Sequence, residues 1–185
     1  MILLRHGQSE FNLLFSQLRQ DPGIIDPVLT PLGHQQAEEA AEALAREGIR
    51  RILVSPYRRA IQTALPTAKR LGLPLTVTPV VRERYAFTCD IGSARTNLAR
   101  HFPEVDFTHL EEVWWPPEEE PAAHVEGRAA LFRAEMAALD DWAHTLVVTH
   151  WGFIMALTGL SVANGQILRV DPNGPAPETV PWKHH

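Results

Sequence analysis

The chain has 185 residues, of which 45% are hydrophobic and 21% charged, and its formal net charge is −5. This size and composition predict a single globular domain with a hydrophobic core. The acidic balance argues against a nucleic-acid partner, which would need a basic face. No apolar run approaches the ~20 residues that cross a bilayer, and a single cysteine excludes an internal disulfide framework. No export signal is evident, so we expect a cytoplasmic protein without membrane association.

Four short apolar segments are rich in β-branched residues, which is typical of strands buried on both faces of a parallel sheet. Helical patterns lie between these segments. The alternation predicts an α/β fold, a three-layer α/β/α sandwich with a mostly parallel central sheet and right-handed crossovers. The four predicted strands are residues 2–4 (ILL), 52–54 (ILV), 75–81 (LTVTPVV) and 146–148 (LVV).

The first two predicted helices have clear start signals. Thr30 and Pro31 are typical of an N-cap and a first helical residue, and the pattern that follows runs to Gly48. Ser55 and Pro56 repeat this start signal directly after the second predicted strand.

The second helix should end at Gly72, and Pro66 should kink or split it. A third helix is predicted over residues 125–142, and a fourth after His150. The tail, residues 171–185, is rich in proline and should be extended, and we assign no role to its last two histidines.

Residues 85–124 show little periodicity, and one short helix is predicted there, over 95–101. Long irregular segments in compact domains often serve as lids, so we interpret this one as a lid or substrate insertion. Trp114 and Trp115 within it either pack in a core or line a substrate pocket. The run at 118–120 (EEE) is predicted to be a solvated charge run.

Polar and ionisable side chains follow every predicted strand at the point where that strand ends. In open α/β sheets, ligands bind at the carboxyl ends of the strands. We therefore expect one edge of the sheet to gather these residues: Arg5 and His6 after the first strand, Ser55, Arg58 and Arg59 after the second, Arg82 and Glu83 after the third, and Thr149 and His150 after the last.

This combination of side chains suits phosphoryl transfer. A neutral imidazole is a good nucleophile toward phosphorus. Arginine forks and a second histidine can hold the equatorial oxygens, where the charge of the transferred group lies. A carboxylic acid can protonate the departing alkoxide and then activate water. Because side chains supply the positive charge, we expect no metal ion and no cofactor.

Four segments resemble, in the same order, motifs of the histidine phosphatase superfamily, also called phosphoglycerate mutase-like. The tripeptide Arg-His-Gly alone is a weak signal, whereas four ordered matches are a strong one. The resemblance implies the phosphoglycerate mutase-like fold and covers most of the chain outside residues 85–124. The segments are LLRHGQSEFN (3–12), LTPLGHQQA (29–37), SPYRRAIQTA (55–64) and VVTHWG (147–152).

The resemblance also implies roles for individual residues. His6 would be the phosphorylated nucleophile, and Glu83 the general acid and base. Two positions depart from the family pattern: Trp151 stands where a glycine usually follows the late histidine, and RERYAF lacks the glycine that often follows the acid. The implied phosphate and substrate residues are Arg5, Ser9, Asn12, Arg59 rather than Arg58, His150 and Trp151.

We therefore predict a metal-independent phosphatase that hydrolyses small phosphomonoesters through a phosphohistidine intermediate. A mutase, which returns the phosphoryl group to its substrate, is one alternative. A second is a cysteine-dependent phosphatase, because Cys89 and Arg95 fit the pattern C-x-x-G-x-x-R. A third is a phospholigand-binding protein without turnover.

Overall fold

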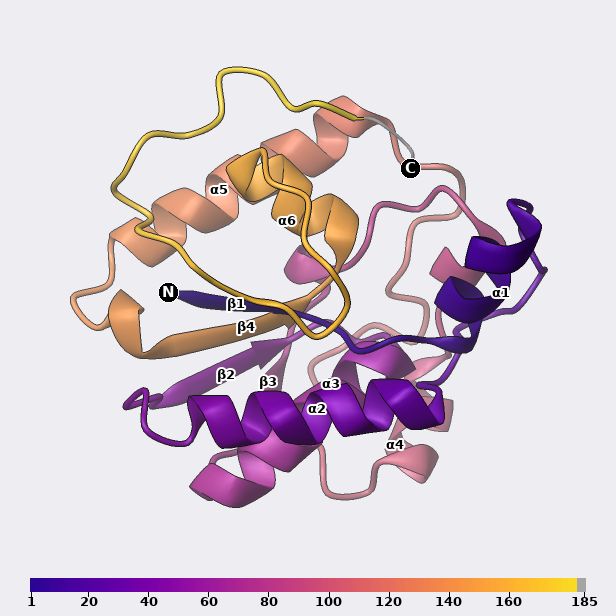
Figure 1. Cartoon of the computed structure of the whole chain (residues 1–185), viewed down its shortest axis with the longest axis horizontal. Coiled ribbons are helices and arrows are strands. Elements are labelled where there is room, and N and C mark those ends of the chain that lie inside the picture. Colours follow the sequence, from indigo (N-terminus) through magenta and orange to yellow (C-terminus); the bar gives the residue numbers. More distant parts are fainter. Residues whose placement is uncertain (183–185) are drawn as a thin grey trace.

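A five-stranded sheet forms the centre of the computed structural model, which describes residues 1–182 (Figure 1). The strand order is β3-β2-β4-β1-β5. The first four strands are parallel and β5 runs antiparallel to β1, which confirms the predicted mostly parallel sheet. The last residues of the predicted tail, 183–185, lie outside the described residues. The strands are β1 (Ile2–Arg5), β2 (Arg51–Val54), β3 (Leu75–Val77), β4 (Thr145–Thr149) and β5 (Ile167–Arg169).

Helices cover both faces of the sheet, with α2 and α3 below it and α5 and α6 above it in Figure 1. Leu146 and Val148 of β4 pack in the core that α2 and α3 share, whereas Val147 between them packs in the core of α5 and α6. Burial of both faces explains why the strands appear as continuous apolar runs. The helices are α1 (Glu10–Leu18), α2 (Pro31–Leu44), α3 (Arg58–Leu71), α4 (Arg95–His101), α5 (Ala122–Ala137) and α6 (Trp151–Thr158).

Several predicted boundaries are confirmed and others are wrong. Thr30 is the N-cap of α2, as predicted, but the helix ends at Leu44, four residues before Gly48. α3 begins at Arg58 and ends against Gly72, which has the left-handed conformation expected there. Pro66 does not split α3, because the buried face of this helix keeps its packing against α2 despite one missing hydrogen bond.

The third predicted strand is shorter than its apolar run. β3 ends at Val77, and residues Pro79–Val81 form a 3₁₀ turn, since a proline cannot donate to a sheet ladder. α5 likewise ends at Ala137, and a separate 3₁₀ turn covers Trp142–His144. The short helix over 95–101 is confirmed. Within residues 1–182, no helix has the length and apolar character needed to span a membrane.

Candidate active site

A cavity of about 280 Å³ opens at the carboxyl ends of β1 and β2 and gathers most of the predicted site residues. His150 is fully buried beside this cavity rather than in its lining, with its ring centroid 5.0 Å from that of His6. Four residues of the predicted insertion also line the cavity: Ala86, Phe87, Cys89 and Asp90. The predicted residues in the lining are Arg5, His6, Ser9, Asn12, Arg59, Glu83 and Trp151.

The glycine after His6 allows two segments of backbone to meet. A Cβ atom on Gly7 would lie 2.4 Å from the carbonyl oxygen of Gly33, and one on Gly33 would lie 2.1 Å from that of Gln8. Both positions therefore require glycine. Their contact fixes the start of α2 against the turn that follows β1, where His6 is held by an N–H bond to the Thr149 carbonyl.

His6 is held in one tautomer. Its Nδ1 lies 2.7 Å from the carbonyl oxygen of Gly7, which can only accept, so Nδ1 carries the proton and Nε2 keeps its lone pair. Burial lowers the pKa of His6 well below 6.5, and the charges of Arg59 and Arg5 lower it further. The imidazole is therefore neutral at pH 7, as a nucleophile must be.

Two arginines, Arg5 half-buried and Arg59 fully buried, place positive charge beside His6. Arg5 donates from Nη1 to the Val162 carbonyl at 2.6 Å, while its buried Nε has no partner among the described residues. Burial lowers the pKa of Arg5 to about 10, which still leaves it charged. Arg59 stacks on Tyr57, 4.3 Å from the ring centroid. Within residues 1–182, no group of three or more His, Cys, Asp or Glu residues is placed to hold a metal ion.

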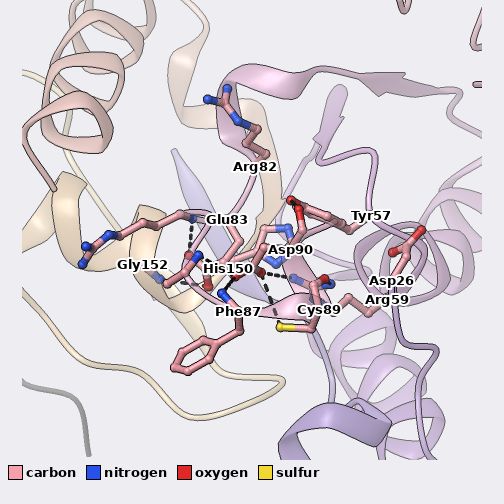
Figure 2. Close-up of polar contacts among 12 residues, drawn as sticks. Asp26, Tyr57, Arg59, Arg82, Glu83, Phe87, Cys89, Asp90, His150 and Gly152 are labelled. Atoms are coloured by element: carbon pink, nitrogen blue, oxygen red, sulfur yellow. Dashed lines mark hydrogen bonds and ion pairs between the residues drawn. The ribbon is translucent and has the colours of Figure 1, made fainter. Parts of the chain in front are cut away.

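Asp90 fixes the direction of the Arg59 guanidinium (Figure 2). Nη2 of Arg59 lies 3.1 Å from Oδ1 of Asp90, and its Nη1 donates to the Cys89 carbonyl at 2.9 Å. The other Asp90 oxygen accepts N–H bonds from Ala86 and Phe87. Burial raises the pKa of Asp90 to about 6, although Arg59 opposes this shift.

The geometry does not support the cysteine-dependent alternative. Burial, followed by the charge of Asp90, raises the pKa of the Cys89 thiol, so it is not a thiolate at neutral pH. Arg95 does not line the cavity that Cys89 lines but pairs with Glu112 at the surface, with Nε and Oε2 3.3 Å apart. Cys89 accepts from Arg59 at its carbonyl and donates from its thiol to Oδ1 of Asp90 at 3.5 Å, so both groups position neighbouring side chains.

Glu83 is oriented by two backbone N–H groups. One oxygen accepts from Arg84 at 2.8 Å and the other from Gly152 at 3.2 Å, the second of which joins the acid to the start of α6 (Figure 2). A Cβ atom on Gly152 would lie only 2.3 Å from Oε1 of Glu83. The glycine two positions after His150 therefore makes room for the carboxylate.

His150 has one occupied and one free ring nitrogen. Nε2 lies 2.7 Å from Oγ of Ser55, and Nδ1 is buried without a partner among residues 1–182. If the serine hydroxyl donates to Nε2, the proton is on Nδ1, where it can be donated to an anion. The ring lies nearly perpendicular to that of Tyr57, with centroids 5.1 Å apart.

The prediction that Glu120 belongs to a solvated charge run is wrong. Its side chain is 4% exposed and accepts bonds from Arg82 and from both Nε and Nη2 of Arg128. Arg128 also donates to the Val80, Arg82 and Glu83 carbonyls, so this ion pair holds the chain that carries Glu83. The two residues lie eight positions apart in the sequence and belong to no motif, so their pairing could not be predicted.

Asn164 was also missed and supports the opposite side of the site. Its Nδ2 donates to the His6 carbonyl and to Oδ1 of Asn12, both at 3.1 Å. The same Oδ1 accepts the backbone N–H of Ser9, the N-cap of α1. The amide oxygen of Asn12 is therefore fully used, and its NH₂ group is available for an anion.

The tryptophans of the insertion pack in the core instead of lining the cavity. Trp114 is buried against Tyr57 and donates from Nε1 to the Ser93 carbonyl. Trp115 packs against the same core. The tryptophans that do line the cavity are Trp151, as predicted, and Trp182 of the tail, which no sequence motif indicates.

The two buried histidines predict a loss of stability in acid. Their pKa values are lowered well below 6.5 in the folded state, chiefly by burial, so the unfolded chain binds more protons as the pH falls below 6.5. Between pH 7 and 5.5 the pair should reduce the free energy of unfolding by about 2 kcal/mol. Urea unfolding of the His6→Gln variant should show about half this dependence, whereas His34→Gln, at an exposed histidine, should match the unmodified chain. An unchanged slope in His6→Gln would contradict the prediction.

The fold and this cavity define an α/β protein with a histidine and two arginines gathered in one cavity at the carboxyl edge of its sheet. The chain belongs to the histidine phosphatase superfamily, branch 1, whose family model matches residues 1–172. A glucosyl-3-phosphoglycerate phosphatase of Mycolicibacterium vanbaalenii is 30% identical over 91% of this chain and 78% of its own. A putative phosphoserine phosphatase 2 of Hydrogenobacter thermophilus is 30% identical over 94% of this chain and 86% of its own.

Solved structures agree with this assignment. A mycobacterial glucosyl-3-phosphoglycerate phosphatase in complex with VO3 is 26% identical and covers 90% of this chain and 88% of that one, with a TM-score of 0.62. The ecdysone phosphate phosphatase from Bombix mori in complex with tungstate is 16% identical, with a TM-score of 0.67 over 100% and 96% of the two chains, and shows the same fold.

Proposed function

We propose that this chain is a phosphatase that hydrolyses small phosphomonoesters through a phosphohistidine at His6, without a metal ion. The observation that carries the proposal is the state of His6, whose Nε2 is unprotonated within a cavity that Arg5 and Arg59 also line. The relatives whose names describe phosphatases of small phosphorylated compounds support the class of reaction.

The phosphate group would bind among donors that the fold leaves unused. Arg5 would donate from Nε, Arg59 from the part of its guanidinium not held by Asp90, and Asn12 from its NH₂ group. His150 would donate from Nδ1, with the Ser55 hydroxyl fixing that tautomer. We expect these groups to surround the oxygens whose charge develops in phosphoryl transfer.

In the first step, Nε2 of His6 would attack phosphorus as the bond to the leaving oxygen breaks. Glu83, in its acid form, would give its proton to the departing alkoxide. In the second step, the Glu83 carboxylate would take a proton from water as the water oxygen attacks phosphorus. The P–N bond then breaks, inorganic phosphate leaves and His6 returns to its neutral state.

Phosphate release from 4-nitrophenyl phosphate in the presence of a chelator tests this proposal. We expect turnover to continue under chelation and to fall by at least about 10³-fold in His6→Ala. Cys89→Ser should retain activity within a few fold. Phosphate binding without turnover in the unmodified chain, or a loss of activity on chelation, would contradict the proposal.

A second assay of the unmodified chain distinguishes hydrolysis from a mutase reaction, in which the phosphoryl group returns to the substrate. Incubation with 3-phosphoglycerate and a bisphosphoglycerate primer should yield free phosphate instead of an isomer. Formation of 2-phosphoglycerate without release of phosphate would show a mutase.

A further inference from the structure

Aromatic rings make up much of the cavity lining outside the proposed phosphate pocket. Phe11 and Phe15 of α1 and Phe87 form one cluster, with ring centroids 5.2 to 5.5 Å apart. Trp151 and Trp182 form a second pair, with centroids 6.2 Å apart. All five side chains line the same cavity as His6.

The polar atoms of both tryptophans are already bonded to the protein. Trp151 donates from Nε1 to Oγ of Ser161 at 2.9 Å, and Trp182 donates from Nε1 to Oε1 of Glu126 at 2.6 Å. These bonds fix the orientation of the two indoles. What they leave for a ligand is therefore aromatic surface and not hydrogen-bonding capacity.

Beyond Arg5 and Arg59, Arg84 is the one arginine or lysine among the described residues that line the cavity. Its Nε donates to the Glu120 carbonyl, its Nη2 lies 3.7 Å from Glu119, and its guanidinium stacks 5.3 Å from the centroid of Trp182. Arg84 is thus anchored at Nε, and its guanidinium lies over the Trp182 ring.

The size of the cavity is compatible with a compact substrate. A volume of about 280 Å³ is close to that of the smallest small-molecule sites. Part of this volume belongs to the phosphate group. The remainder is enough for one flat ring system.

We propose that the substrate of this chain carries a compact aromatic group on its alcohol side, which packs against Trp151 and Trp182 and against the ring cluster of Phe11, Phe15 and Phe87. This inference rests on the proposed function and specifies its substrate class. Such a ligand gains from burial of apolar surface and from ring–ring contacts.

Benzyl phosphate and glycerol 1-phosphate provide the test, because both release a primary alkoxide and differ mainly in the group that occupies the cavity. We expect kcat/KM to be at least tenfold higher for benzyl phosphate. Trp182→Ala should lower kcat/KM about tenfold for benzyl phosphate and less than twofold for glycerol 1-phosphate. The matched control is Trp142→Ala, at the opposite end of β4, which should leave both values unchanged.

Equal kcat/KM values for the two esters, or equal losses for both in Trp182→Ala, would overturn the inference. Calorimetric binding of benzylphosphonate and methylphosphonate tests the aromatic site independently of the proposed function, because neither compound is hydrolysed. Tighter binding of benzylphosphonate that weakens in Trp182→Ala would support the aromatic site even if no ester were turned over. Equal binding of the two phosphonates would overturn it.

Discussion

Replacing Glu83 by glutamine should lower kcat for phosphomonoester hydrolysis by about 10²- to 10⁴-fold, the usual contribution of a general acid and base. Glutamine has nearly the same shape but can neither give up nor take up the proton that both steps require. The effect should be smaller on the first step with 4-nitrophenyl phosphate, whose leaving group needs no proton. A stoichiometric burst of 4-nitrophenol followed by slow turnover is therefore expected.

The matched control is Glu119→Gln, the same change at an exposed glutamate, which should leave kcat within twofold. Gly152→Ala tests the position of Glu83 without changing the residue itself, because the added methyl group would displace its carboxylate. We expect a lower kcat in this variant as well. A kcat for Glu83→Gln within fivefold of that of the unmodified chain would rule out Glu83 as the acid and base.

Replacing Glu120 by glutamine should lower the free energy of unfolding by about 3 to 5 kcal/mol, the cost of breaking a buried ion pair by removing one partner. The glutamate balances the charges of Arg82 and Arg128, both largely buried. Because Arg128 also holds the Glu83 carbonyl, the fraction that remains folded should have a reduced kcat. Urea unfolding and initial rates measure the two effects.

Glu118→Gln is the control for this change, since it alters an exposed residue of the same acidic run. Its free energy of unfolding should stay within about 0.5 kcal/mol of the unmodified value. Similar losses in the two variants would show that net charge, and not the ion pair of Glu120, determines the effect.

The layered fold could be predicted because the signals for its buried strands and capped helices lie within short stretches of sequence. Strands buried on both faces require continuous apolar runs, and the caps at Thr30 and Gly72 act within one helical turn. β5 could not be predicted, because it has three residues, lies at the edge of the sheet and is only partly buried. Pro66 was misjudged because packing across two helices outweighs a local preference.

The sequence also predicted which residues meet around the cavity, because the strand ends determine their position. It could not predict contacts that arise from tertiary structure alone. Asn164 reaches the His6 carbonyl across 158 residues, and Trp182 comes from a tail without periodicity. Glu120 could not be distinguished from its exposed neighbours by residue type, although its burial decides its role.

The chemical position of the phosphoryl group in the trapped intermediate is the most direct test of the central claim. Glu83→Gln treated with 4-nitrophenyl phosphate and denatured in alkali can be examined by ³¹P NMR and by mass spectrometry of its peptides. We predict an acid-labile phosphoryl group on Nε2 of His6, absent in the additional variant His6→Ala and retained with Cys89→Ser. An acid-stable adduct, or one that disappears with Cys89→Ser, would contradict the account.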